Sequence, residues 1–219
     1  QWPSGPEAQR PVLVDPTGRR QTLLAERRAY GFPRYSPDGR RIAFTIAAGG
    51  SSDVWIYNVA SRTMSRLTGG GPANERPEWT PDGERVVFRT DRANQSSLWW
   101  QRVDAADTAR PLVLSKSAPV YEGIFTPDGK AVVYQVDTSS SDLEYRMLAG
   151  DTTPKPIIAT RAYEESPRLS PDGRWIASTG GFLPALTLSD PSGPTRWAVG
   201  LGEAGVAHEL AFRPDGATL

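Results

Sequence analysis

Ser36-Pro37-Asp38-Gly39-Arg40 decides the fold, because this stretch returns along the chain at nearly constant spacing. The other copies are Thr80-Pro81-Asp82-Gly83-Glu84, Thr126-Pro127-Asp128-Gly129-Lys130, Ser170-Pro171-Asp172-Gly173-Arg174 and Arg213-Pro214-Asp215-Gly216-Ala217. Successive aspartates are 44, 46, 44 and 43 residues apart. A repeat of about 40–45 residues, with four short strands in each, has the size of one β-propeller blade. The spacing therefore predicts a propeller.

Each copy has the composition of a tight turn between two strands. Proline presets the backbone for the turn, aspartate bonds to nearby backbone N–H groups, and glycine adopts the left-handed conformation that closes the turn. β-Branched residues such as Ile42 and Val86 stand four places after the aspartate, which is typical of a hairpin. We therefore interpret the following residues as turn formers and not as ligands: Asp38, Gly39, Asp82, Gly83, Asp128, Gly129, Asp172, Gly173, Asp215 and Gly216.

A third and a fourth strand are expected after each turn, and no long stretch has a helical period, so the predicted fold class is all-β. Four-stranded blades are expected at about 30–68, 74–115, 120–160 and 164–200, within one domain spanning 1–219. Residues 10–25 and 207–219 each supply half a blade. Either these halves meet to close a five-bladed ring, or the chain is a segment of a longer propeller. The short last strand favours the segment.

Composition excludes several classes of function. The chain has 25 basic and 25 acidic side chains and no net charge, so nucleic acid is not an expected partner. No apolar run is long enough to span a bilayer. The absence of cysteine excludes disulfides and thiolate chemistry.

Catalytic and cofactor motifs are also missing, so we expect no catalytic residues, cofactor or metal set. His208 is the only histidine, and no serine lies in a Gly-x-Ser-x-Gly turn. The stretch 200–205 matches the dinucleotide-binding pattern G-x-G-x-x-G, but a strand is expected after it where a helix is needed. An oxygen-only calcium site at 137–142 remains an alternative to a solvated hairpin tip.

The strongest binding candidates come from the geometry of a propeller, in which the first strand of each blade lines the central channel. Residues six to eight places before each turn aspartate should ring one mouth of that channel. Five carboxylates gather there, and such clusters attract counter-ions and basic groups. We therefore hypothesise that the mouth binds a cationic peptide segment, a small ligand or a cation; an unoccupied solvated rim is the alternative. The candidates are Tyr30, Glu75, Arg76, Tyr121, Glu122, Glu164, Glu165, His208 and Glu209.

The repeated pattern, seen in PRYSPDGRRIAF (33–44), PEWTPDGERVVF (77–88) and PRLSPDGRWIAS (167–178), resembles the WD-repeat-like units of TolB-type propellers. The stretches at 12–44, 52–68 and 163–178 more narrowly resemble the propeller that follows the catalytic domain in bacterial serine/threonine protein kinases. This resemblance covers most of residues 10–219. The fourth unit departs from the pattern at Ser178-Thr179-Gly180-Gly181.

That resemblance implies a non-catalytic sensory or interaction module with a protein or peptide partner, placed outside the cytoplasmic membrane. No kinase catalytic signature is present, so no phosphotransfer residue is carried over. Three alternatives stay open: a separate periplasmic TolB-like interaction protein, the substrate-gating propeller of a prolyl-oligopeptidase-type serine peptidase, and a propeller that is itself an enzyme. A cytoplasmic location is also compatible with the sequence.

Overall fold

A computed structural model describes residues 8–69, 71, 73–92, 95–104, 108–115, 118–139, 141–159, 164–180, 185–189 and 196–200. Within these ranges the chain forms eighteen strands and no helix. The strands form four four-stranded antiparallel sheets and one two-stranded sheet. None of the described segments forms a helix that could span a lipid bilayer.

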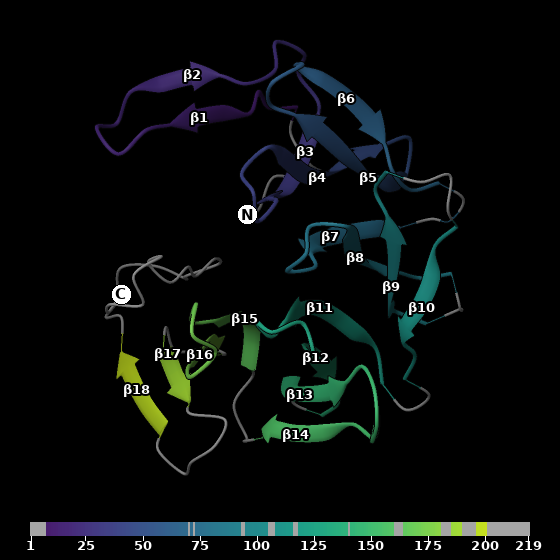
Figure 1. The fold of residues 1–219 in the computed structure, drawn as a ribbon, viewed down its shortest axis with the longest axis vertical. Coiled ribbons are helices and arrows are strands. Elements are labelled where there is room, and N and C mark those ends of the chain that lie inside the picture. The colour runs from purple at the N-terminus through teal and green to yellow at the C-terminus, as the bar shows by residue number, and fades with distance from the viewer. Residues whose placement is uncertain are drawn as a thin grey trace.

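Each four-stranded sheet is a meander, in which every strand pairs with the next along the chain. Figure 1 shows the sheets around a common centre, with the first strand of each sheet innermost and the fourth outermost. The first blade contains β3 (Ala29–Tyr35), β4 (Arg41–Ala48), β5 (Ser51–Asn58) and β6 (Thr63–Arg66). The second contains β7 (Asn74–Trp79), β8 (Arg85–Thr90), β9 (Ser97–Arg102) and β10 (Arg110–Val113).

The third blade contains β11 (Val120–Phe125), β12 (Ala131–Asp137), β13 (Ser141–Met147) and β14 (Lys155–Ile158). The fourth contains β15 (Glu164–Leu169), β16 (Ile176–Gly180), β17 (Ala185–Ser189) and β18 (Arg196–Gly200). Thus β16 and β17 pair along five residues although the sequence departs there from the repeat. The prediction of an all-β propeller with four four-stranded blades is confirmed.

The recurring turn is closed by its serine or threonine as well as by its glycine. In the first blade, the N–H of Gly39 donates to the Ser36 carbonyl at 2.8 Å, and Gly39 has a φ of 68°. The Ser36 hydroxyl donates to Asp38 at 2.6 Å and accepts the N–H of Arg41 at 2.9 Å. The second, third and fourth turns repeat these bonds. Each turn therefore fixes the register of the hairpin that it joins.

Successive turns also touch one another. A Cβ placed on Gly173 would lie 3.2 Å from Cδ of Pro127, and a Cβ on Gly129 would lie 3.9 Å from Cγ of Pro81. The proline of one turn thus lies beside the glycine of the next, and at Gly173 a side chain would crowd that proline. The turns form a continuous rim at one end of the molecule.

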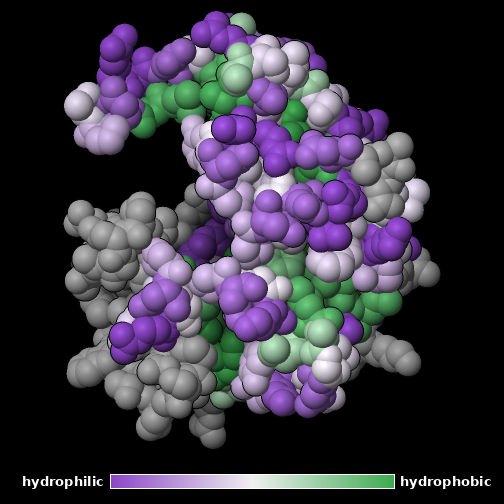
Figure 2. Space-filling model, in the orientation of Figure 1, coloured by the Kyte–Doolittle hydropathy of each residue, from purple (hydrophilic) through white to green (hydrophobic). Residues whose placement is uncertain are grey.

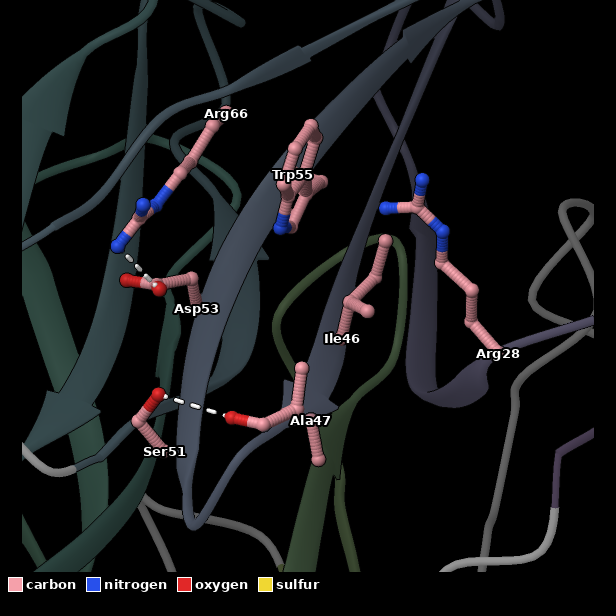
Figure 3. Close-up of a pocket in the computed structure, with 8 residues that line it drawn as sticks. Arg28, Ile46, Ala47, Ser51, Asp53, Trp55 and Arg66 are labelled. Carbon is pink, nitrogen blue, oxygen red and sulfur yellow. Dashed lines mark hydrogen bonds and ion pairs between the residues drawn. The ribbon is translucent and has the colours of Figure 1, made fainter.

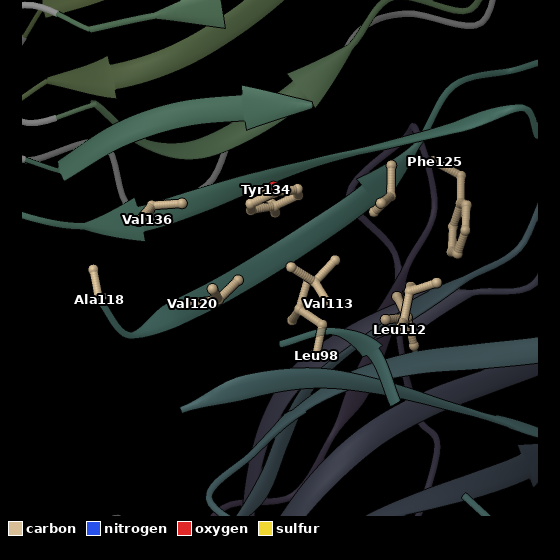
Figure 4. Packing of buried hydrophobic residues seen from close by; sticks show 10 residues of the cluster. Leu98, Leu112, Val113, Ala118, Val120, Phe125, Tyr134 and Val136 are labelled. Atoms are coloured by element: carbon tan, nitrogen blue, oxygen red, sulfur yellow. The ribbon is translucent and has the colours of Figure 1, made fainter. Parts of the chain in front are cut away.

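The core consists of layers between neighbouring blades. Val54 and Ile56 of the first blade belong to one buried cluster with Val86 and Phe88 of the second. Between the second and third blades, Leu98 is buried with Val120, Val132 and Tyr134, as Figure 4 shows. Each blade thus buries one face against the next blade.

The two-stranded sheet consists of β1 (Val12–Val14) and β2 (Arg20–Thr22). Leu13 and Leu23 contact the cluster of Ile42, Phe44 and Tyr57 in the first blade. Val12 and Val14 are 49% and 57% exposed. This hairpin therefore covers the face of the first blade that is opposite the second blade.

Candidate functional site

The pairing of the innermost strands with their neighbours is interrupted near the first residues of these strands. We call the end of the channel where the innermost strands begin the start end. In the first blade, Phe32 and Pro33 together lie opposite the single residue Phe44, so the strand contains a β-bulge. Arg76 and Pro77 form the corresponding bulge in the second blade. In the fourth blade, the same two positions are occupied by Ser166 and Pro167.

Each of these bulges holds a non-glycine residue in the left-handed region. Phe32 and Arg76 have φ of 51°, and Ser166 has φ of 49°. Such conformations cost about 1–3 kcal/mol each and persist only where the surroundings enforce them. Three strained residues at one end of the channel mark that end as a functional candidate.

Five side chains from four blades meet in the channel, and we call them the central ion cluster: Arg34, Arg76, Arg168, Glu78 and Glu122. Glu122 is its centre, with a side chain 5% exposed. It accepts a hydrogen bond from Arg168 at 2.8 Å and another from Arg34 at 3.2 Å, and Arg76 lies 3.6 Å away.

Glu78 extends the central ion cluster towards the turns. It accepts a hydrogen bond from Nε of Arg34 at 3.1 Å and another from the N–H of Trp79 at 3.0 Å. Burial raises the pKa of the Glu78 carboxyl, and the positive charge of Arg34 opposes that rise. The cluster links the first strands of all four blades, so it fixes how the blades are placed around the channel.

Sequence analysis placed Arg76 and Glu122 together at the mouth, and the structure brings these two into contact. Glu75 lies between blades instead, where it accepts hydrogen bonds from Ser52 at 2.8 Å and Arg89 at 3.0 Å. The guanidinium of the same Arg89 lies over the ring of Tyr121, with its Cζ 5.2 Å from the ring centroid.

The remaining candidates are separated. Tyr30 packs edge-on against Phe44, at 5.6 Å between ring centroids, within the first blade. Glu164 is buried at the start of β15, and Glu165 beside it is exposed. His208 and Glu209 lie outside the described residues, as do Asp215 and Gly216.

Two of the carboxylates that were expected to attract cations at the start end have arginine partners. The Glu122 carboxylate is already covered by three guanidinium groups, and Glu75 is paired with Arg89. A cationic ligand would have to displace an arginine from either carboxylate. The central ion cluster itself carries three positive and two negative side chains.

Sequence analysis missed Arg34, Glu78 and Arg168. These three residues stand four places before their turn aspartates, two positions beyond those considered. The sequence did contain a signal for them. Charged residues occupy the same position of the inner strand in three repeats, and charged side chains in a buried strand need partners of opposite charge.

A cavity of about 280 Å³ lies at the turn end of the channel. Trp79, Phe125 and Leu169 line it with the turn prolines of the second, third and fourth blades, and Glu78 and Arg168 contribute the charged groups. Apolar walls with a few polar groups are typical of ligand sites. This end can receive an apolar side chain.

A second cavity, of about 370 Å³, lies on the first blade (Figure 3). Arg28 lies over the ring of Trp55 at 5.6 Å, and Arg66 contacts Asp53 at 2.6 Å. Asp53 also accepts hydrogen bonds from Thr68 and from Asn74 of the second blade, so both of its carboxylate oxygens have partners within the protein.

The surface around these features is largely polar. Figure 2 shows hydrophilic residues over most of the visible face, with hydrophobic side chains exposed in patches between the blades. In the described part of the chain, no group of three or more histidine, cysteine, aspartate or glutamate side chains is arranged to hold a metal ion. At the tip considered for calcium, Asp142 accepts a hydrogen bond from Thr138 at 3.0 Å.

The fold and its channel define a β-propeller with four-stranded blades. A model of the TolB beta propeller domain matches residues 11–196, so the chain belongs to the TolB beta propeller domain family. No curated protein matches this chain as a relative in sequence.

Solved structures show the same fold at low sequence identity. TolB from Acinetobacter baumannii is similar with a TM-score of 0.72 and 23% identity, over 84% of this chain and 46% of that chain. A putative TolB from Agrobacterium tumefaciens gives a TM-score of 0.71 and 18% identity, over 84% of this chain and 66% of that one. A puromycin-hydrolyzing peptidase from Mycobacterium tuberculosis gives a TM-score of 0.66 and 14% identity, over 85% of this chain and 33% of that one. This chain thus spans less than two thirds of each of these proteins.

Proposed function

We propose that this propeller is a non-catalytic binding module that takes a peptide segment of a partner protein at the start end of its channel. The observation that carries the proposal is the set of three strained residues, Phe32, Arg76 and Ser166, at that end. Strain of this kind clusters at ligand sites because the surrounding structure holds the backbone ready. The central ion cluster supports the proposal, since it keeps the four inner strands in fixed positions beneath the site.

The lack of catalytic groups in the sequence agrees with a binding role. One histidine and no cysteine leave few ways to build a nucleophile with its base. Glu78 and Glu122 are both paired with arginine, so these two do not act as the independent carboxylates that acid–base chemistry uses.

A peptide-display selection against the 219-residue chain tests the binding role. Binding peptides should be enriched, and Tyr121→Ser combined with Phe32→Leu should weaken them by about tenfold or more, which corresponds to about 1.4 kcal/mol. Arg40→Gln combined with Lys130→Gln, at the exposed turn end, is the matched control and should leave binding unchanged. Failure to enrich any peptide, or equal binding by both double variants, would refute the proposal.

We further propose that the module belongs to a larger bacterial protein and lies outside the cytoplasmic membrane, as the sensory region of a serine/threonine kinase. The support is the resemblance of the stretches at 12–44, 52–68 and 163–178 to kinase-linked propellers. Reading the coding sequence on both sides is the test. A kinase domain followed by a membrane helix upstream is expected, whereas a secretion signal with no kinase would make this a separate TolB-like protein.

A peptidase propeller is the second candidate, favoured by the fold shared with the Mycobacterium tuberculosis peptidase. In that case the nucleophile belongs to another domain, and this chain controls access to it. A downstream Gly-x-Ser-x-Gly motif in an α/β-hydrolase domain would decide for this candidate.

A further inference from the structure

The Arg76 side chain differs from the other arginines of the channel in what it contacts. Arg34 donates to Glu78, to Glu122 and to the carbonyl of Pro33. Arg168 donates to Glu122 and to the carbonyl of Pro167. For Arg76, the described residues supply one ion-pair contact, at 3.6 Å from Glu122, and no hydrogen bond. Its guanidinium therefore keeps its N–H donors available for a ligand.

The position of this guanidinium is nevertheless fixed. It lies over the ring of Phe32, 4.6 Å from the ring centre, and that residue is at the corresponding bulge of the neighbouring blade. Cation–π contacts of this kind hold a guanidinium in place while leaving its edge free. The Arg76 side chain is one third exposed, so the edge is accessible to solvent. Two strained residues thus place one donor group at the start end.

Within the central ion cluster, the charge favours an anion. Three guanidinium groups and two carboxylates give the central ion cluster one excess positive charge. Glu75, at the same end, is paired with Arg89, which also contacts Asp91, and Glu165 is an exposed carboxylate among the described residues of that rim. A guanidinium edge with two parallel N–H groups matches a carboxylate in geometry as well as charge.

We propose that Arg76 binds a carboxylate of the peptide received at the start end, with Phe32 holding its guanidinium in position. The proposal rests on the proposed binding function and names the chemical group that this site recognises. The carboxylate comes from an acidic side chain or from a free C-terminus. The structure thus assigns an acidic partner to a chain that itself has no net charge.

Three synthetic probes separate the sources of the carboxylate. The first is a hexapeptide of alternating Glu and Ser with both ends blocked, the second replaces Glu by Gln, and the third is the Gln peptide with a free C-terminal carboxylate. The measurement is the ¹H–¹⁵N resonance of the Arg76 Nε–H group during titration, with affinity followed in parallel by calorimetry. We expect a saturable shift with the first or third probe, at least tenfold tighter than with the second.

Variants then assign the effect to this side chain. Arg76→Gln should weaken the acidic probe at least tenfold, Phe32→Leu should weaken it by less, and Arg40→Gln at the turn end should leave it unchanged. Circular dichroism and urea unfolding verify that each variant is folded. The proposal would be overturned if neither carboxylate probe bound more tightly than the blocked Gln peptide, or if Arg76→Gln left the binding of the carboxylate probes unchanged. The peptide-display selection is independent of these outcomes, so neutral binders there would preserve the binding function while refuting the carboxylate.

Discussion

Replacing Glu122 by glutamine should reduce the stability of the propeller more than any change of a surface charge. The side chain is 5% exposed and is contacted by guanidinium groups from three other blades. Glutamine keeps the shape but removes the charge that compensates Arg34 and Arg168, whose side chains are themselves only 15% and 13% exposed. Leaving a buried charge without its partner typically costs about 3–5 kcal/mol.

We expect the lower part of that range, because the amide oxygen of glutamine still accepts one hydrogen bond. A loss of about 3 kcal/mol lowers the melting temperature of a domain of this size by about 6–12 °C. Urea unfolding followed by tryptophan fluorescence measures the change, since the chain has 7 tryptophans. Glu84→Gln is the matched control, because Glu84 pairs with Arg102 at 2.8 Å in a half-exposed position. That variant should lose about 0–1 kcal/mol.

The double variant Glu122→Gln with Arg168→Gln provides the internal check. If the stability loss comes from uncompensated charge, the loss in the double variant should be smaller than the sum of the losses in the two single variants by about 0.5–3 kcal/mol. Equal losses for Glu122→Gln and Glu84→Gln, or strict additivity in the double variant, would refute the view that the ion cluster holds the blades together.

Three further outcomes follow from the turns and the third blade. Gly123→Ala should destabilise by about 1–3 kcal/mol, because its Cβ would lie 2.5 Å from a buried Leu98 methyl; Leu98→Val should relieve part of that loss, as thermal unfolding would reveal. Gly39→Ala should lower the free energy of unfolding by about 1–2 kcal/mol through backbone strain alone. Gly173→Ala should lower it by more, because the added Cβ would lie 3.2 Å from Pro127. Equal losses of the two variants in urea unfolding would contradict the expected difference. The turn aspartates of the first, third and fourth blades have lowered pKa values, caused first by their serine or threonine hydroxyls and then by backbone N–H groups. Their stabilisation is present above the unfolded-state pKa of about 3.9 and is lost as the pH falls through the lower folded values, so replacing all three by asparagine should flatten the acid limb of a stability–pH curve.

The fold could be predicted because the information for it is local and repeated. Proline, aspartate and glycine in that order specify one turn conformation wherever they occur, and regular spacing then leaves little choice of architecture. The hairpin strands follow from β-branched and aromatic residues on both sides of each turn. Even the fourth blade forms its second and third strands where the repeat pattern is weak, because pairing with neighbouring strands supplies what the local sequence lacks.

The site was harder to predict because it depends on contacts between blades. Side chains of a regular strand alternate between two faces, and a bulge interrupts that alternation. Counting backwards from the turn therefore gives the correct end of the channel but not the direction of each side chain. Glu75 was expected at the mouth and instead contacts Arg89, while Arg34, four places before its turn, reaches Glu122 two blades away.

The third blade shows how a departure from the repeat creates the centre of the channel. In the other three blades, the bulge contains a left-handed residue followed by proline. The third blade has no proline there, and its bulge is displaced by one residue towards the start of the strand, so that Tyr121 and Glu122 together lie opposite Gln135.

Gly123 follows this displaced bulge, at a point where Leu98 leaves no space for a side chain. The displaced bulge thus occurs in the one described blade whose inner strand presents a carboxylate to arginines from the other three. A fully regular third repeat would place a left-handed residue and a proline at this position, as its neighbours do, and the arginines would lose their shared partner. The irregularity is therefore the feature that turns four similar blades into a channel with a defined charge.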